Sequence, residues 1–171
     1  MQREAAQAPI TVLRGARATR DAVRSALTSH SFAHFACHGV LDLAEPSRSG
    51  ICLHDGVLPV SEIAGLRLAG AELAVLSACH TAGNAAQLTD EALHPAAAFQ
   101  LAGFRQVIAT SWPVSDAAAA DLASRFYHQL RVPGGVTADA VPAALHTAVR
   151  ALRDDDPRAV TTWAAYLHTG P

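Results

Sequence analysis

The stretch LAVLSACHTA, residues 73–82, decides the fold class. Its apolar run fills residues 73–78 and leads directly into a cysteine and a histidine. Two further apolar runs of similar length fill residues 32–37 and 106–112. Short, continuous apolar strands are typical of a parallel sheet that is buried on both faces. The sequence therefore predicts an α/β fold with a mostly parallel central sheet.

Helical periodicity fills much of the chain between these runs, so we expect helices on both faces of the sheet, in a three-layer sandwich. Thr19 and Ser115 are suitable N-caps, and Gly103 is a suitable helix end. Asp55-Gly56 is a strong hairpin signal. The predicted helices fill residues 19–28, 61–66, 89–102, 115–130 and 137–152. The predicted strands fill residues 10–13, 32–37, 50–53, 57–60, 73–78, 106–112 and 164–167.

Composition and charge exclude several classes of protein. A chain of 171 residues with 50% hydrophobic and 16% charged residues is expected to fold as one domain, with residues 1–9 as a disordered tail. The net charge is −2 and no basic block is present, so we expect no nucleic-acid or membrane surface. Three cysteines, no signal peptide and no long apolar span predict a cytoplasmic protein without a disulfide framework.

Reactive side chains follow the predicted buried strands, where parallel sheets usually carry their chemistry. His38 and Gly39 follow the first run, and Cys79 follows the second. A thiol becomes a good nucleophile when a nearby imidazole takes its proton. The backbone N–H groups of Gly39 and Cys79 are candidates to stabilise an oxyanion. This order of residues predicts a Cys/His site for acyl transfer, with no cofactor.

Structural readings of the same residues remain open. His38 can be a core histidine, and Cys79 an inert buried thiol. The residues His34, Cys37, His38, Cys79 and His80 could also be counted as a zinc set. Strand spacing places residues i and i+4 about 13 Å apart, and no C-x-x-C pair is present, so we expect no metal. Cys37 and Cys52 are predicted to belong to the core.

Five stretches of the chain together resemble the CHAT domain, a caspase-like cysteine peptidase domain related to separase and the caspases. The resemblance extends from about residue 10 to residue 170. The stretches are HFACHG (34–39), LHDG.LPVSEIAGL (53–66), LAVLSACHTA (73–82), DEALHPAAAFQLAGFRQVIATSWPVSD (90–116) and TTWAAYLHTG (161–170).

The resemblance implies a caspase-like three-layer α/β sandwich, a single domain over residues 1–171 that lacks the family's N-terminal strands. It makes His38 the general acid and base, Cys79 the nucleophile and Gly39 part of the oxyanion hole. His80 stands where the family usually has glutamate. The loop after it is less rich in glycine than is usual, so its shape is left open.

The resemblance also implies substrate-binding residues after the third apolar run. Ser111 and Trp112 match the strand that lines the substrate groove. Asp116 matches an acidic residue that, in separase-like relatives, binds the basic residue before the scissile bond. The alternative is that Asp116 only stabilises the first turn of a helix, where the helix dipole favours a negative charge. Caspases have an arginine where this chain has Pro113, which argues against acidic specificity.

The function predicted from the sequence is that of a cysteine endopeptidase acting on a protein substrate after a basic residue. The resemblance implies a regulatory partner, such as a tetratricopeptide-repeat protein or domain, and a role in bacterial signalling or defence. The alternative is an inactive or latent CHAT-fold module that binds other proteins.

Overall fold

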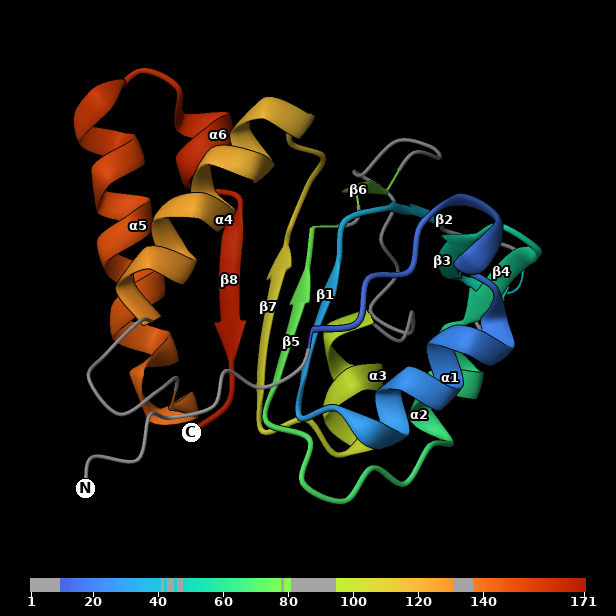
Figure 1. The fold of residues 1–171 in the computed structure, drawn as a ribbon. Coiled ribbons are helices and arrows are strands. Elements are labelled where there is room, and N and C mark those ends of the chain that lie inside the picture. The colour runs from blue at the N-terminus through green and yellow to red at the C-terminus, as the bar shows by residue number, and fades with distance from the viewer. Residues whose placement is uncertain are drawn as a thin grey trace, which may run out of the picture.

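The computed structural model of the chain describes residues 10–40, 42, 45, 48–77, 79–80, 95–130 and 137–171. Its centre is a four-stranded sheet in the order β1-β5-β7-β8 (Figure 1). Strands β1, β5 and β7 are parallel, and β8 is antiparallel to β7. Their bounds are β1 Phe32–Phe35, β5 Leu73–Leu76, β7 Gln106–Thr110 and β8 Tyr166–Thr169. The mostly parallel central sheet that the sequence predicted is confirmed.

A second, smaller sheet lies beyond the carboxyl ends of β1 and β5. Its order is β4-β3-β2-β6, with β2 parallel to β6 and antiparallel to β3. Strands β3 and β4 form the predicted hairpin, in which Gly56 has a φ of 129° that favours glycine. The strands are β2 His38–Val40, β3 Gly50–Leu53, β4 Gly56–Pro59 and β6 Cys79–His80.

Helices cover both faces of the central sheet, which confirms the predicted three-layer, caspase-like sandwich (Figure 1). Helices α1, α2 and α3 lie on one side, and α4, α5 and α6 lie on the other. Their bounds are α1 Arg20–Ser29, α2 Val60–Ala64, α3 Pro95–Ala102, α4 Asp116–Leu130, α5 Val141–Asp155 and α6 Val160–Trp163. Two single 3₁₀ turns are Gly15–Arg17 and Ala138–Ala140.

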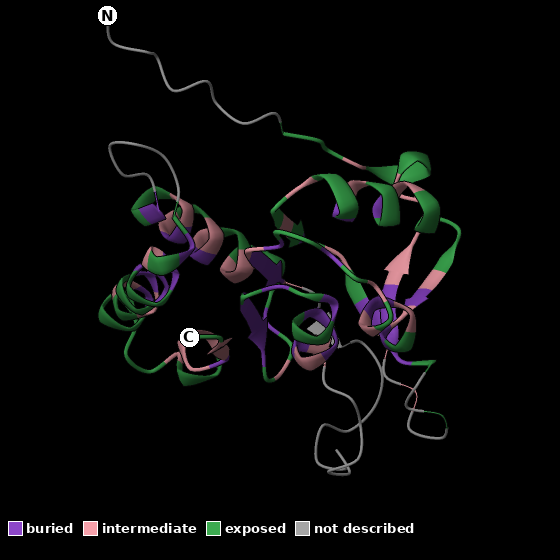
Figure 2. Ribbon diagram, turned by 90° about the horizontal axis from the view of Figure 1, so that it is seen from below, coloured by how far each residue is buried: buried purple, intermediate pink, exposed green. Residues whose placement is uncertain are grey.

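Strand β5 shows why the apolar runs are continuous. All four of its residues are buried. Ala74 and Leu76 belong to the core cluster beneath α2 and α3, whereas Leu73 and Val75 belong to the cluster beneath α4 and α5. Buried residues accordingly gather along the sheet, between the helical layers (Figure 2). A strand that packs against both layers needs apolar side chains at every position.

The caps predicted for two helices are confirmed. The Thr19 hydroxyl accepts a hydrogen bond from the backbone N–H of Ala22 at 3.3 Å, at the start of α1. Ser115 does the same for Ala118 at 3.3 Å before α4. Gly103 follows α3 with a φ of 121°, as a helix-ending glycine should.

Some boundaries differ from the prediction. Helix α5 begins later than the predicted helix over residues 137–152, because a 3₁₀ turn precedes it, and it ends three residues later, at Asp155. Strand β8 begins two residues after the predicted strand over 164–167. The predicted tail over residues 1–9 and the first part of the predicted helix, 89–94, lie outside the described residues.

The edge of the central sheet corrects two predictions. Residues 10–13 were expected to form a strand, but they are irregular, because none of their backbone groups pairs with a strand in the described structure. Residues 32–37 were expected to form one buried strand. Instead β1 is an edge strand in which only Phe35 is buried, and the chain bends at Cys37 before β2.

Candidate active site

Two pairs of strands run side by side and end at the candidate site. Phe32 lies opposite Leu73 and Phe35 lies opposite Leu76 in the parallel pair β1–β5. Beyond the break in both strands, β2 and β6 are again parallel, with His38 opposite Cys79. The sequence offset between the two chain segments is the same before and after the break. The two segments therefore stay in register from the central sheet into the second sheet.

This register makes His38 and Cys79 direct neighbours across the second sheet. Adjacent strands lie about 4.8 Å apart, so residues far apart in the sequence have neighbouring backbone positions here. The side chain of His38 is exposed. Cys79 is described at the level of its backbone, within the two-residue strand β6.

Gly39 occupies the centre of the same sheet. It lies opposite Ile51 of β3 on one side and His80 of β6 on the other, and it is buried. Its predicted part in an oxyanion hole stays a prediction.

The predicted substrate-binding residues follow β7, at the same edge of the sheet as the ends of β1 and β5. Ser111 is exposed, and its backbone N–H donates to the Ala165 carbonyl at 2.8 Å. Trp112 is half-buried, and its indole Nε1–H donates to the Thr161 carbonyl at 2.6 Å. Asp116 is the exposed first residue of α4, where its charge suits the helix dipole.

A hydrogen-bonded group of three side chains joins β1, the end of β5 and α4, and the sequence did not indicate it as a group. Nε2 of His34 is 3.0 Å from the Ser77 hydroxyl, and Nδ1 of His34 is 3.1 Å from the Tyr127 hydroxyl. His34 comes from β1, Ser77 follows β5 and Tyr127 lies on α4. The signal for two members was present, since His34 and Ser77 shortly precede His38 and Cys79.

Burial controls the protonation of this three-residue group. His34 is an exposed residue by its surface area, yet partial burial of its imidazole lowers its pKa below the usual value. Burial raises the pKa of Tyr127 well above its usual value. Both rings are therefore neutral near neutral pH, and each imidazole nitrogen can act as one donor or one acceptor.

The other two cysteines are half-buried free thiols. Burial, and then the neighbouring Cys52, raise the pKa of Cys37 to about 11. A thiol with that pKa stays protonated near neutral pH and is a poor nucleophile. Cys37 packs against the core cluster beneath α3, as predicted for a core residue. Cys52 is half-buried in β3, and its predicted place in the core stays a prediction.

Metal ligands do not gather among the described side chains. No group of three or more histidine, cysteine, aspartate or glutamate side chains comes together there to hold an ion. Two members of the five-residue zinc set, Cys79 and His80, have side chains outside the described part of the structure.

Comparison with protein-family models gives a family for this chain. The family model described as the CHAT domain matches residues 2–171. No curated protein matches the chain. Within the described ranges, every helix is too short or too polar to cross a lipid bilayer.

Proposed function

The chain belongs to the CHAT-domain family, which is related to caspase-like cysteine peptidases, and from this we propose that it is a cysteine endopeptidase. Cys79 is the proposed nucleophile and His38 the proposed general acid and base. The observation that carries the proposal is the register of β2 and β6, in which these two residues are opposite neighbours.

The proposed reaction has two stages, acylation and deacylation, and each stage uses two proton transfers through His38. The imidazole of His38 takes the thiol proton, and the sulfur of Cys79 attacks the peptide carbonyl carbon. The backbone N–H groups of Gly39 and Cys79 are the proposed donors to the oxyanion. His38 then gives its proton to the leaving amine. Water, activated by the same imidazole, hydrolyses the thioester, which releases the new carboxylate and restores the thiol.

A peptide acyloxymethyl ketone with arginine at the reactive position tests the nucleophile. We expect it to label the wild-type chain and not Cys79→Ala, because only a thiolate displaces the acyloxy group to form a stable thioether. His38→Ala should slow labelling by about a hundredfold or more, since general-base assistance contributes about 10²–10⁴-fold. Mass spectrometry of the labelled peptide identifies the modified residue.

Cys52→Ala is the matched control. It removes a thiol from β3, which pairs with β2, and should leave labelling intact. Equal labelling of wild type and Cys79→Ala would show that Cys79 is not the nucleophile. A folded wild-type chain that the probe does not label would overturn the peptidase proposal and favour the non-catalytic binding module.

Asp116 is proposed to bind the basic side chain of the residue that precedes the scissile bond. An arginine fork pairs with a carboxylate through two hydrogen bonds, which an amide cannot match. Asp116→Asn is expected to reduce the preference for arginine over leucine probes by about tenfold. Competitive labelling with a panel of probes measures that preference. Asp139→Asn, at an exposed acid in another helical first turn, is the control; an unchanged preference in Asp116→Asn would remove it from the pocket.

A further inference from the structure

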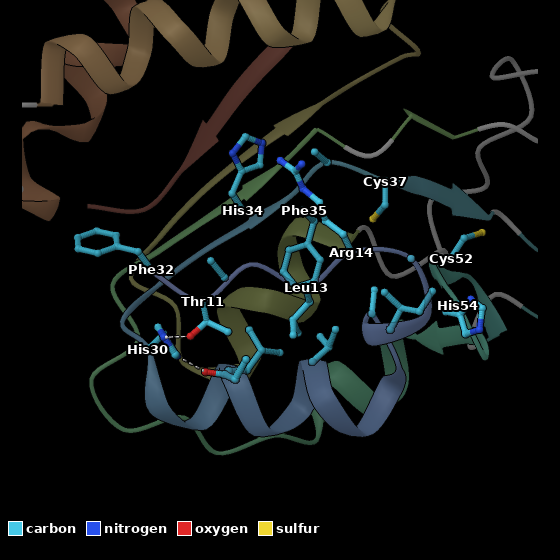
Figure 3. A pocket seen from close by; sticks show the side chains of 18 residues that line it. Thr11, Leu13, Arg14, His30, Phe32, His34, Phe35, Cys37, Cys52 and His54 are labelled. Atoms are coloured by element: carbon cyan, nitrogen blue, oxygen red, sulfur yellow. Dashed lines mark hydrogen bonds between the residues drawn. The ribbon is translucent and has the colours of Figure 1, made fainter. Parts of the chain in front are cut away.

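A groove runs along the free edge of β1, on the side of α1 (Figure 3). It is a cavity of about 650 Å³ that extends as far as Cys37, and His38 does not contribute to its lining. One wall is the chain from Phe32 to Cys37, the opposite wall includes Thr11, Leu13 and Arg14, and Val23 and Leu27 of α1 also line it. The volume is within the usual range of about 300–1,000 Å³ for binding sites.

The groove follows the edge of the strand and not one of its faces. Side chains alternate between the two faces of a strand, so a cavity on one face contacts every second residue. Here all residues from 32 to 37 contribute to the lining. The backbone of β1 is therefore the main surface that the groove presents.

The hydrogen bonds to β5 show which backbone groups face the groove. The carbonyls of Ser31 and Phe35 accept from the N–H groups of Leu73 at 3.1 Å and Ser77 at 2.9 Å. In a parallel pair, the alternate residues then direct their N–H and C=O groups to the other side. Residues 32, 34 and 36 are those alternates, and no backbone hydrogen bond within the described chain reaches them.

The opposite wall is irregular but rich in β-branched residues. Thr11 and Leu13 line the groove, whereas Ile10 and Val12 are 88% and 49% exposed. Phe32 on β1 is 38% exposed. Three of the five large apolar side chains that are exposed in the described chain therefore gather around this edge. An unpaired strand edge beside exposed apolar residues is a template for another strand.

The charges of the lining favour an acidic occupant. Arg14 is exposed and makes no ion pair in the described structure. The other ionisable residues that line the groove are His30, His34, His54, Cys37 and Cys52. None of the described residues that line the groove carries a carboxylate. Val23 and Leu27, both buried, give the α1 side an apolar surface.

We propose that this groove binds an extended segment of a second protein, with alternating apolar and acidic residues, which adds to β1 as an edge strand. Its backbone pairs with residues 32, 34 and 36. Its apolar side chains face Val23 and Leu27 on α1, and a carboxylate pairs with Arg14. The site is separate from the proposed peptidase chemistry and does not depend on it.

A designed peptide tests the proposal in the Cys79→Ala chain, where the proposed peptidase cannot cut it. The probe is acetyl-Val-Glu-Val-Glu-Val-Glu-Val-amide with a fluorescent label, and fluorescence anisotropy measures its binding. Arg14→Glu should weaken binding about fivefold, since reversing one exposed charge has a modest effect. The same variant should bind the peptide with lysine in place of glutamate more tightly than the parent chain does. Arg150→Glu is the matched control, because Arg150 is an exposed arginine on α5, outside the groove lining.

Residue-resolved amide exchange locates the bound strand. On binding, exchange should slow at the amides of Phe32, His34 and Ala36, while Ala33 and Phe35, already paired with β5, should change little. A peptide of equal length and charge with prolines at alternate valines should not bind, because it lacks the amides for a ladder. The proposal would be overturned if these three amides stayed unprotected at a saturating peptide concentration. It would also be overturned if the proline peptide bound as tightly as the parent peptide.

Discussion

His34 shows how one side chain connects three parts of this molecule. Its two ring nitrogens lie within hydrogen-bond distance of Ser77 after β5 and Tyr127 on α4. The rings of His34 and Tyr127 are also in contact, with centroids 5.6 Å apart. A neutral imidazole satisfies both neighbours by donating at one nitrogen and accepting at the other. Both hydroxyls can also accept, so the preference for neutral His34, seen in its lowered pKa, comes from burial of the imidazole.

The lowered pKa of His34 predicts a loss of stability in acid. The unfolded chain binds a proton at this residue near pH 6.5, whereas the folded chain binds it only at lower pH. The unfolded state therefore binds more protons as the pH falls below about 6.5, and the free energy of unfolding decreases. Urea unfolding between pH 7 and pH 5 should show a shallower decrease for His34→Gln than for wild type.

His146→Gln is the control for this measurement, because His146 is exposed on α5. His168, whose pKa is also lowered by burial, remains in both variants and keeps part of the pH dependence. An identical slope for His34→Gln and wild type would contradict the expectation.

The sequence indicated His38 and Cys79 because residues after buried strands are known places for chemistry. It did not indicate Tyr127, because the spacing of α4 reports which residues are buried but not which strand they meet. Contacts between a helix and a strand far away in the sequence depend on the packing of the layers.

Among the single elements, α3 ends in a way that only glycine allows. Gly103 has a φ of 121°, and a Cβ there would lie 2.6 Å from the Leu68 carbonyl oxygen. The Gly103 position is also held by the Leu68 N–H, which donates to the Ala102 carbonyl at 2.9 Å. Any side chain therefore meets both an unfavourable backbone conformation and a close backbone neighbour.

Gly103→Ala is expected to lower the free energy of unfolding by about 1–3 kcal/mol, as for other residues forced into rare backbone conformations. Gly65→Ala is the matched control at the end of α2. Its φ is −76°, and the nearest atom to a new Cβ is 3.4 Å away. Its effect should stay within about 1 kcal/mol. Chemical denaturation measures both, and equal effects would contradict the assignment.

The boundaries of strands were the least predictable elements. Residues 32–37 look like one strand in the sequence, but the chain leaves the central sheet after Phe35 and joins the second sheet at His38. Both parts are extended, so an apolar pattern does not reveal the change of sheet. Residues 10–13 are rich in β-branched residues, yet without a partner they remain irregular, because strand propensity depends on pairing.

At the scale of the whole molecule, the three layers were predictable, because a strand that is buried on both faces has a continuous run of apolar residues. Phe99 on α3 and Phe126 on α4 are both essentially buried, and they belong to core clusters on opposite faces of the sheet. The apolar runs between them predicted such a sheet. The second sheet was not predicted as a unit, because its pairing joins short segments from distant parts of the chain.

The shared alignment of the two strand segments has a consequence for how sequences of this kind can change. Side chains along either segment can be exchanged for others of suitable size while the ladder keeps its alignment. The insertion or deletion of a single residue before His38, in one segment only, would move the imidazole by about 3.3 Å along its strand and turn it to the opposite face. We therefore expect related chains to vary here in composition but to preserve the number of residues between each strand and its reactive end.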